Sequence, residues 1–172
     1  MKNIIILTPV YNDWESFTKL IVEIDKVVSN FKNMSFKLIA VNDGSKEKAP
    51  SLKLPPNLEL IEILNMKINQ GHAICLANGM KYALKNYEFD GLILMDADGE
   101  DRPEEIFDLI KKAREQNNVS VVAKRVKRSE GPIFSIFYFL HKVLTLILTG
   151  KLMNFGNYSL IIKKDVETII KD

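Results

Sequence analysis

Short apolar runs alternate with helical apolar periodicity along most of this 172-residue chain. Runs rich in β-branched residues predict buried strands, and apolar residues spaced three and four apart predict amphipathic helices. Strands that alternate with helices are typical of an α/β domain with a mostly parallel sheet. The expected strands are about Asn3–Thr8, Phe36–Val41, Leu58–Leu64, Gly91–Met95 and Val119–Ala123, and the expected helices are about Trp14–Phe31, Gly71–Asn86 and Pro103–Gln116.

The composition suits one globular domain, because 47% of the residues are hydrophobic and 27% are charged. A formal net charge of +2 is too small to indicate nucleic-acid binding. Cys75 is the one cysteine and excludes an internal disulfide framework; its apolar helical context predicts a packed thiol in a reducing compartment. The first apolar run, Ile4–Leu7, is too short for a signal peptide, so we expect a cytoplasmic protein.

Polar clusters directly follow three of the expected strands, beginning at Thr8, Asn42 and Asp96. The carboxyl ends of parallel strands meet at one edge of a sheet, where open α/β sheets bind their ligands, so we expect these clusters to converge. Asp43, on a tight Gly-Ser turn, can accept hydrogen bonds from a base or ribose, and Tyr11 can offer a ring face or a hydroxyl. Taken alone, the Asp43 segment is also compatible with an ordinary turn.

The stretch Leu92–Ile106 is the candidate catalytic centre, since an apolar run gives way there to a series of acids. Asp96 and Asp98 leave the strand as alternating carboxylates, and hard oxygen ligands of this kind suit Mg²⁺ or Mn²⁺. An EF-hand loop is excluded, because counting from Asp96 the position that requires glycine holds Asp101. A solvated acidic turn that binds no metal is the alternative.

The segments TPVYND, VNDGS, NQGHA and MDADGED, in this order and at these spacings, resemble the family 2 glycosyltransferases, which have the GT-A nucleotide-sugar-binding fold. The resemblance covers nearly the whole chain and implies a Rossmann-like α/β sheet flanked by helices. We expect residues 1–131 to form the nucleotide-sugar-binding core. Residues 132–172 should add an amphipathic helix and an acceptor-side segment to the same domain. The chain ends within an expected helix, so we also expect a fragment of a longer protein.

The family's motifs imply a role for each matching residue of this chain. The first motif and the aspartate after the second strand hold the nucleotide base, which implies this role for Pro9, Tyr11, Asp13 and Asp43. The N-x-G segment lines the donor pocket, which implies this role for Asn69 and Gly71. A helix start with Asn69 as its cap is a compatible alternative.

The D-x-D motif of the family contacts the ribose and the metal bound to the diphosphate, which implies these roles for Asp96 and Asp98. A divalent ion would act as a Lewis acid on the leaving diphosphate, and Asp98 is the first choice as its ligand. Glu100 stands where relatives have glutamine and adds a possible second ligand beside Asp98. Asp101 is the only nearby carboxylate that we can name as a catalytic base.

The pattern D-x-D-x-Q-D-x-P-E-x-I is similar to the branch that transfers sugars to polyprenyl phosphates, including dolichyl-phosphate mannose synthases. Arginines in the matching region bind the acceptor phosphate in that branch, which implies this role for Arg125 and Arg128. A solvated basic turn is the alternative. The segment Met153–Ser159 lacks the aspartate that many relatives have there. This absence matters less for a phosphate acceptor, which is already ionised near neutral pH.

The apolar segment Ile133–Leu148 is shorter than the roughly 20 residues that a membrane-spanning helix needs. Its wide apolar face could lie in a membrane interface, in the core or in a homodimer contact. We therefore predict a metal-dependent glycosyltransferase with a nucleotide-sugar donor and a polyprenyl phosphate acceptor on the cytoplasmic face of the membrane. The alternatives are a transferase acting on a saccharide hydroxyl and a non-catalytic nucleotide-sugar-binding module of a larger protein.

Overall fold

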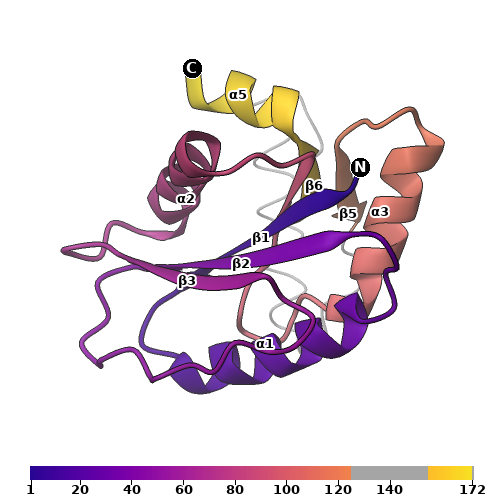
Figure 1. Cartoon of the computed structure of the whole chain (residues 1–172). Coiled ribbons are helices and arrows are strands. Elements are labelled where there is room, and N and C mark those ends of the chain that lie inside the picture. The colour runs from indigo at the N-terminus through magenta and orange to yellow at the C-terminus, as the bar shows by residue number, and fades with distance from the viewer. Residues whose placement is uncertain (125–154, 172) are drawn as a thin grey trace, which may run out of the picture.

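The computed structural model describes residues 1–124 and 155–171, and a six-stranded sheet lies at the centre of these residues (Figure 1). The strands are β1 (Asn3–Val10), β2 (Ser35–Asn42), β3 (Leu60–Asn65), β4 (Gly91–Leu94), β5 (Val121–Lys124) and β6 (Phe155–Ile162). Their order across the sheet is β3-β2-β1-β4-β6-β5. β1 pairs in parallel with β2 and β4, and β2 pairs in parallel with β3. The sheet is therefore mostly parallel, as the alternation of elements predicts.

Helices cover both faces of the sheet (Figure 1). One face is covered by α1 (Trp14–Val28), the 3₁₀ turn η1 (Pro103–Glu105) and α3 (Ile106–Glu115), and the other face by α2 (His72–Asn86) and α5 (Lys163–Lys171). In β1, Ile4 and Ile6 face the first layer while Ile5 and Leu7 face the second. Burying each such side chain contributes about 1.5–3 kcal/mol, so the central strand holds both layers together.

The first helix is shorter than the sequence predicts, because it ends at Val28 instead of continuing to Phe31. The hydroxyl of Ser29 donates a 2.7 Å hydrogen bond to the carbonyl of Lys26. Carbonyls of the last helical turn have no partner within the helix, and this side chain satisfies one of them. Ser29 thus supports an end to the helix that apolar periodicity alone does not reveal.

The strand β6 was not predicted from the sequence. It inserts between β4 and β5 and runs antiparallel to both. Leu94, the last residue of β4, pairs with Ser159 in the middle of β6, so the residues of β6 before Ser159 extend beyond the end of β4. The antiparallel direction therefore brings the first residues of β6 to the same edge of the sheet as the acidic segment that follows β4.

The expected amphipathic helix, Ile133–Leu148, and the basic residues Arg125 and Arg128 lie outside the described residues. Within residues 1–124 and 155–171, no helix combines the length and the apolar character that crossing a membrane requires.

Candidate active site

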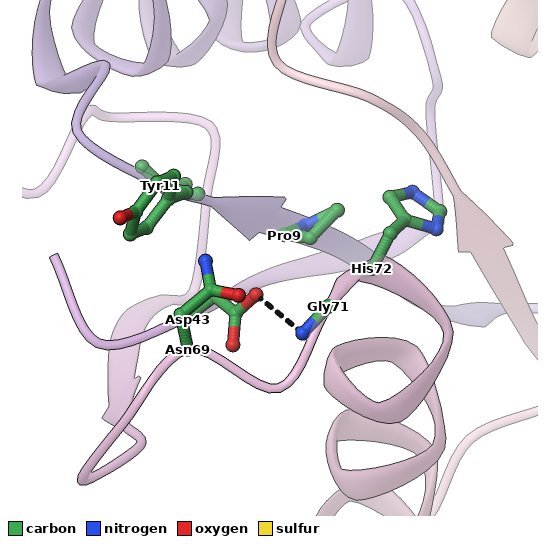
Figure 2. A pocket seen from close by; sticks show the side chains of 7 residues that line it. Pro9, Tyr11, Asp43, Asn69, Gly71 and His72 are labelled. Atoms are coloured by element: carbon green, nitrogen blue, oxygen red, sulfur yellow. Dashed lines mark hydrogen bonds between the residues drawn. The ribbon is translucent and has the colours of Figure 1, made fainter.

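A pocket of about 270 Å³ opens at the carboxyl edge of the parallel strands (Figure 2). Its lining consists of Pro9, Val10, Tyr11, Asp43, Asn69, Gly71 and His72. All but Val10 and His72 are residues that the sequence assigns to donor binding. The clusters after β1 and β2 therefore meet, as parallel strands predict, and the start of α2 joins them. The third predicted cluster, which begins at Asp96, does not line this pocket.

Asp43 fixes the turn that precedes α2. Its Oδ1 accepts a 2.8 Å hydrogen bond from the N–H of Gln70, and its Oδ2 accepts a 2.9 Å bond from the N–H of Gly71 (Figure 2). Only 4% of Asp43 is exposed, so these contacts are shielded from water. Hydrogen bonds to an ionised group are stronger than those between neutral groups. The aspartate after β2 therefore shapes the pocket wall in addition to facing the pocket.

The two hydrogen bonds of Asp43 form a clamp that holds the segment before α2. Gly44 completes this clamp, because its backbone lies directly against the backbone of that segment. Its φ of +68° favours glycine, and a Cβ atom there would lie 2.6 Å from the backbone nitrogen of Asn69. The VNDGS and NQGHA motifs thus form one packed unit. Gly71, with φ of +90°, is the N-cap residue of α2 and supplies no side-chain cap, so the alternative role of Asn69 as helix cap is wrong.

The loops after β1 and β2 are joined beside the pocket. The N–H of Asn12 donates to Ser45 Oγ at 2.9 Å, and Asn12 Oδ1 accepts the N–H of Lys46 at 2.8 Å. Asn12 has a φ of +55°, a conformation that asparagine tolerates better than most residues. These contacts fix the loop that carries Tyr11, whose side chain remains largely accessible to a ligand.

Asp13 stands apart from the residues that line the pocket and caps α1 instead. Its Oδ1 accepts a 3.0 Å hydrogen bond from the N–H of Ser16. This backbone hydrogen bond is the main cause that lowers the pKa of the Asp13 carboxyl. Asp13 therefore has a structural task at the helix start, and its contact with a nucleotide base stays a prediction.

The acidic segment after β4 is tied to the pocket through His72. The Nε2 atom of His72 lies 2.8 Å from Oδ1 of Asp96, and the imidazole also lines the pocket. Asp101 accepts the backbone N–H of Asp96 at 2.8 Å through its own Oδ2. Asp101 is only 8% exposed. The carboxylate that the sequence offers as a catalytic base is thus buried and holds the backbone of the acidic loop.

The donor set of this loop fits a hard divalent cation. Asp98 is exposed, its Oδ1 accepts the N–H of Glu100 at 2.9 Å, and Asp96 is partly exposed. Within the described ranges, no three His, Cys, Asp or Glu side chains gather where they could hold a metal ion by themselves. Mg²⁺ is commonly bound by one or two carboxylates together with substrate phosphates and water. The residues therefore suit a metal site that a diphosphate completes.

The match to known proteins agrees with this arrangement of motifs. The sequence profile of the family described as "Glycosyl transferase family 2" matches residues 5–162. The chain belongs to glycosyltransferase family 2. The matched range extends from β1 to the end of β6, so it includes the pocket, the acidic segment and the antiparallel strand.

Two curated relatives of this family 2 chain show how much of a whole protein it represents. It is 32% identical over 151 residues to YkcC of Bacillus subtilis, which is described as an uncharacterized glycosyltransferase. The match covers 81% of this chain and 44% of YkcC. It is 28% identical to the undecaprenyl-phosphate 4-deoxy-4-formamido-L-arabinose transferase of Photorhabdus laumondii, over 76% of this chain and 39% of that enzyme. The chain therefore spans about two fifths of the length of these relatives.

A solved structure supports the fold. Glucosyl-3-phosphoglycerate synthase from Mycobacterium tuberculosis, in complex with Mn²⁺, UDP-glucose and phosphoglyceric acid, superposes with a TM-score of 0.65 over 95% of this chain and 57% of that one. At 13% sequence identity this likeness shows a shared fold only. The family 2 chain has the α/β fold of the GT-A type.

Sequence reasoning missed two polar residues of this site. His72 belongs to the quoted NQGHA segment, and its place directly after the motif glycine was a usable signal. Asn157 lies on β6, with its Nδ2 3.5 Å from Nε2 of His72. No periodicity in the sequence indicated that β6 returns to this edge, so Asn157 could not be placed beside the pocket without the tertiary structure.

Proposed function

We propose that this family 2 chain is the donor-binding part of a metal-dependent glycosyltransferase that moves a sugar from a nucleotide-sugar to a polyprenyl phosphate. The observation that carries the proposal is the pocket itself, where the motif residues after β1 and β2 meet the turn before α2. The contact between His72 and Asp96 joins this pocket to the acidic segment after β4. One donor molecule could thus meet both halves of the site.

In this proposal, the nucleotide end of the donor lies between Tyr11 and Asp43. Tyr11 is 47% exposed, so its ring can stack on a base. Each carboxylate oxygen of Asp43 accepts one backbone N–H and can accept a second donor, because a carboxylate oxygen has two lone pairs. Pro9, Asn69 and Gly71 would form the remaining contacts with the nucleotide-sugar.

The diphosphate end would lie near Asp96 and Asp98. Mg²⁺ or Mn²⁺ bound there, with Glu100 as a third candidate ligand, would stabilise the negative charge that develops on the leaving diphosphate. Asp98 would hold this ion through its exposed carboxylate, and the ion would in turn orient the phosphate oxygens. The Mn²⁺ and UDP-glucose bound by the mycobacterial structure support a uridine nucleotide and a divalent ion as the first probes.

The burial of Asp101 and its hydrogen bond to the backbone of Asp96 support a phosphate acceptor over a hydroxyl acceptor. Its carboxylate is buried and accepts the N–H of Asp96, which leaves it badly placed to take a proton from an acceptor hydroxyl. A polyprenyl phosphate is already ionised and needs no such base. The Photorhabdus relative, named for undecaprenyl phosphate, points to the same acceptor class, with Arg125 and Arg128 as its proposed ligands. The reaction would then take place at the cytoplasmic face of the membrane.

The test is a thermal-shift panel of nucleoside diphosphates, each measured with and without Mn²⁺. We expect UDP to raise the unfolding temperature more with Mn²⁺ than without it, because a ligand that binds only the folded state stabilises that state. Mn²⁺ alone should give a smaller shift, since the protein contributes few ligands. If no diphosphate gives a Mn²⁺-dependent shift, the proposed donor site is wrong. Transfer to a saccharide hydroxyl, but not to a polyprenyl phosphate, would favour the hydroxyl-acceptor alternative.

A further inference from the structure

We infer that His72 is a positioning residue of the donor site, which orients the Asp96 carboxylate through the hydrogen bond between Nε2 and Oδ1. This inference rests on the proposed function, because it concerns how the donor and its metal meet Asp96. The 2.8 Å distance between these atoms is typical of a hydrogen bond. The bond connects His72, the first residue of α2, to Asp96 in the acidic segment after β4.

The position of His72 is fixed by the hydrogen bonds of Asp43 to the segment before α2. The residue before it, Gly71, donates its N–H to Oδ2 of Asp43, so the start of the helix is fixed relative to β2. The imidazole is 40% exposed, and it lines the pocket instead of packing in the core (Figure 2). Its position thus follows from the fixed helix start, and little apolar burial would be lost if it were replaced.

Asp96 is restrained at its backbone and at one side-chain oxygen. Asp101 accepts its N–H, and His72 occupies its Oδ1. Among the described residues, no hydrogen bond is made to Oδ2 of Asp96, which leaves this oxygen for a ligand. Carboxylates that bind metals or substrates are themselves held by such outer contacts, which set their direction.

The geometry also implies which tautomer of the ring makes this contact. Nε2 faces a carboxylate oxygen, which accepts hydrogen bonds only, so Nε2 carries a proton. A protonated Nε2 has no lone pair to accept from an amide, so Asn157, whose Nδ2 lies 3.5 Å away, is not a second donor to it. The contact to Asp96 is therefore the one that gives His72 its direction.

The test compares UDP affinity by calorimetry, with and without Mn²⁺, in the wild type, His72→Phe and His72→Gln. Phe keeps a ring without an N–H, whereas Gln keeps an amide N–H at a similar reach. We expect His72→Phe to weaken Mn²⁺-dependent UDP binding by about ten- to hundredfold, as losses of outer contacts typically do. His72→Gln should recover most of this loss. The unfolding temperature should change little in both variants, because the imidazole is 40% exposed and does not pack in the core.

A double variant separates positioning from a direct contact with UDP. If His72 acts through Asp96, His72→Phe combined with Asp96→Ala should bind no more weakly than Asp96→Ala alone. Additive losses would overturn the inference, as would a His72→Phe variant with wild-type affinity or a His72→Gln variant without recovery. If the wild type shows no Mn²⁺-dependent binding, the proposed function fails and the inference fails with it. If the wild type and Asp98→Asn behave as proposed, failure of the His72 variants concerns the inference alone.

A metal-free readout tests the contact directly. The chain has two histidines, so long-range ¹H–¹⁵N correlations of the imidazoles can be assigned by the His72→Gln variant. We expect His72 to be protonated on Nε2 in the wild type, and to lose this preference in Asp96→Ala. Protonation of His72 on Nδ1 alone in the wild type would overturn the inference.

Discussion

The carboxylate of Asp43 and the backbone amide of Gly71 are joined by a 2.9 Å hydrogen bond across 28 positions of the sequence. This contact connects the end of β2 to the start of α2. It converts two motifs that look independent in the sequence into one rigid wall of the donor pocket. Substitutions in either motif should therefore affect both pocket shape and stability.

Asp43→Ala should lower the free energy of unfolding by about 1–3 kcal/mol, because two partly buried N–H groups lose their acceptor. It should also weaken binding of free uridine as well as UDP, which calorimetry can measure. Asp25→Ala is a matched control, since Asp25 likewise holds a loop by accepting hydrogen bonds from Asn57, but does not line the pocket. If Asp43→Ala weakens UDP binding and leaves uridine binding unchanged, the placement of the base is wrong.

Gly44→Ala should disrupt the pocket more than Gly99→Ala. Both residues have positive φ, so each alanine should cost about 1–2 kcal/mol for its backbone conformation. Only at Gly44 would the new Cβ also meet backbone atoms of the chain before α2, whereas Gly99 has open space around it. Urea unfolding of the two variants measures this difference. Equal losses of stability would show that the close approach at Gly44 is easily relieved.

Asp98→Asn should remove most of the Mn²⁺-dependent gain in UDP affinity and leave the fold intact. The side chain is exposed, so the free energy of unfolding should change by about 0.5 kcal/mol or less. Asp108→Asn removes an equal charge from the exposed side of α3 and should bind UDP and Mn²⁺ like the wild type. Mn²⁺-dependent affinity that is the same in Asp98→Asn and the wild type would rule out Asp98 as a metal ligand.

Replacing Arg125 and Arg128 together with Gln should abolish transfer to a short-chain polyprenyl phosphate and spare UDP binding. Charge-assisted hydrogen bonds to phosphate contribute about 1.5–3 kcal/mol each, so losing both should lower acceptor affinity by at least a hundredfold. Activity assays in the full-length protein and calorimetry with UDP separate the two effects. A parallel loss of UDP binding would place these arginines at the donor instead of the acceptor.

Asp90 should make stability depend on pH in the acidic range. Its carboxylate accepts the backbone N–H groups of Lys2 and Asn3, the latter at 3.0 Å, and the contact with Lys2 is the main cause that lowers the Asp90 pKa below its ordinary 3.8. A lowered pKa in the folded state means that the stabilisation is present above about pH 4 and is lost as pH falls through the folded value. Urea unfolding should show Asp90→Asn less stable than the wild type at pH 7, with the difference shrinking below pH 4. A constant difference would exclude this linkage.

The sequence by itself determined the class of the fold and most of the pocket lining. The alternation of apolar runs with helical periodicity depends on local side-chain spacing, and three of the polar clusters directly follow a strand. Parallel strands must bring their carboxyl ends to one edge, which predicts that Tyr11 and Asp43 lie close together. The place of Asn69 in the pocket is implied by the family motif instead. The buried state of Cys75 followed in the same way from its helical position.

Only the tertiary structure decided which groups meet across that edge. β6 inserts antiparallel beside β4, and this pairing depends on contacts between segments that are distant in sequence, which local patterns do not encode. The same holds for the hydrogen bond from His72 to Asp96. It also holds for Asp101, which the sequence predicts as a catalytic base but which is buried and accepts the N–H of Asp96. The motifs can be recognised from the sequence alone. The contacts of their side chains depend on how the strands and helices pack.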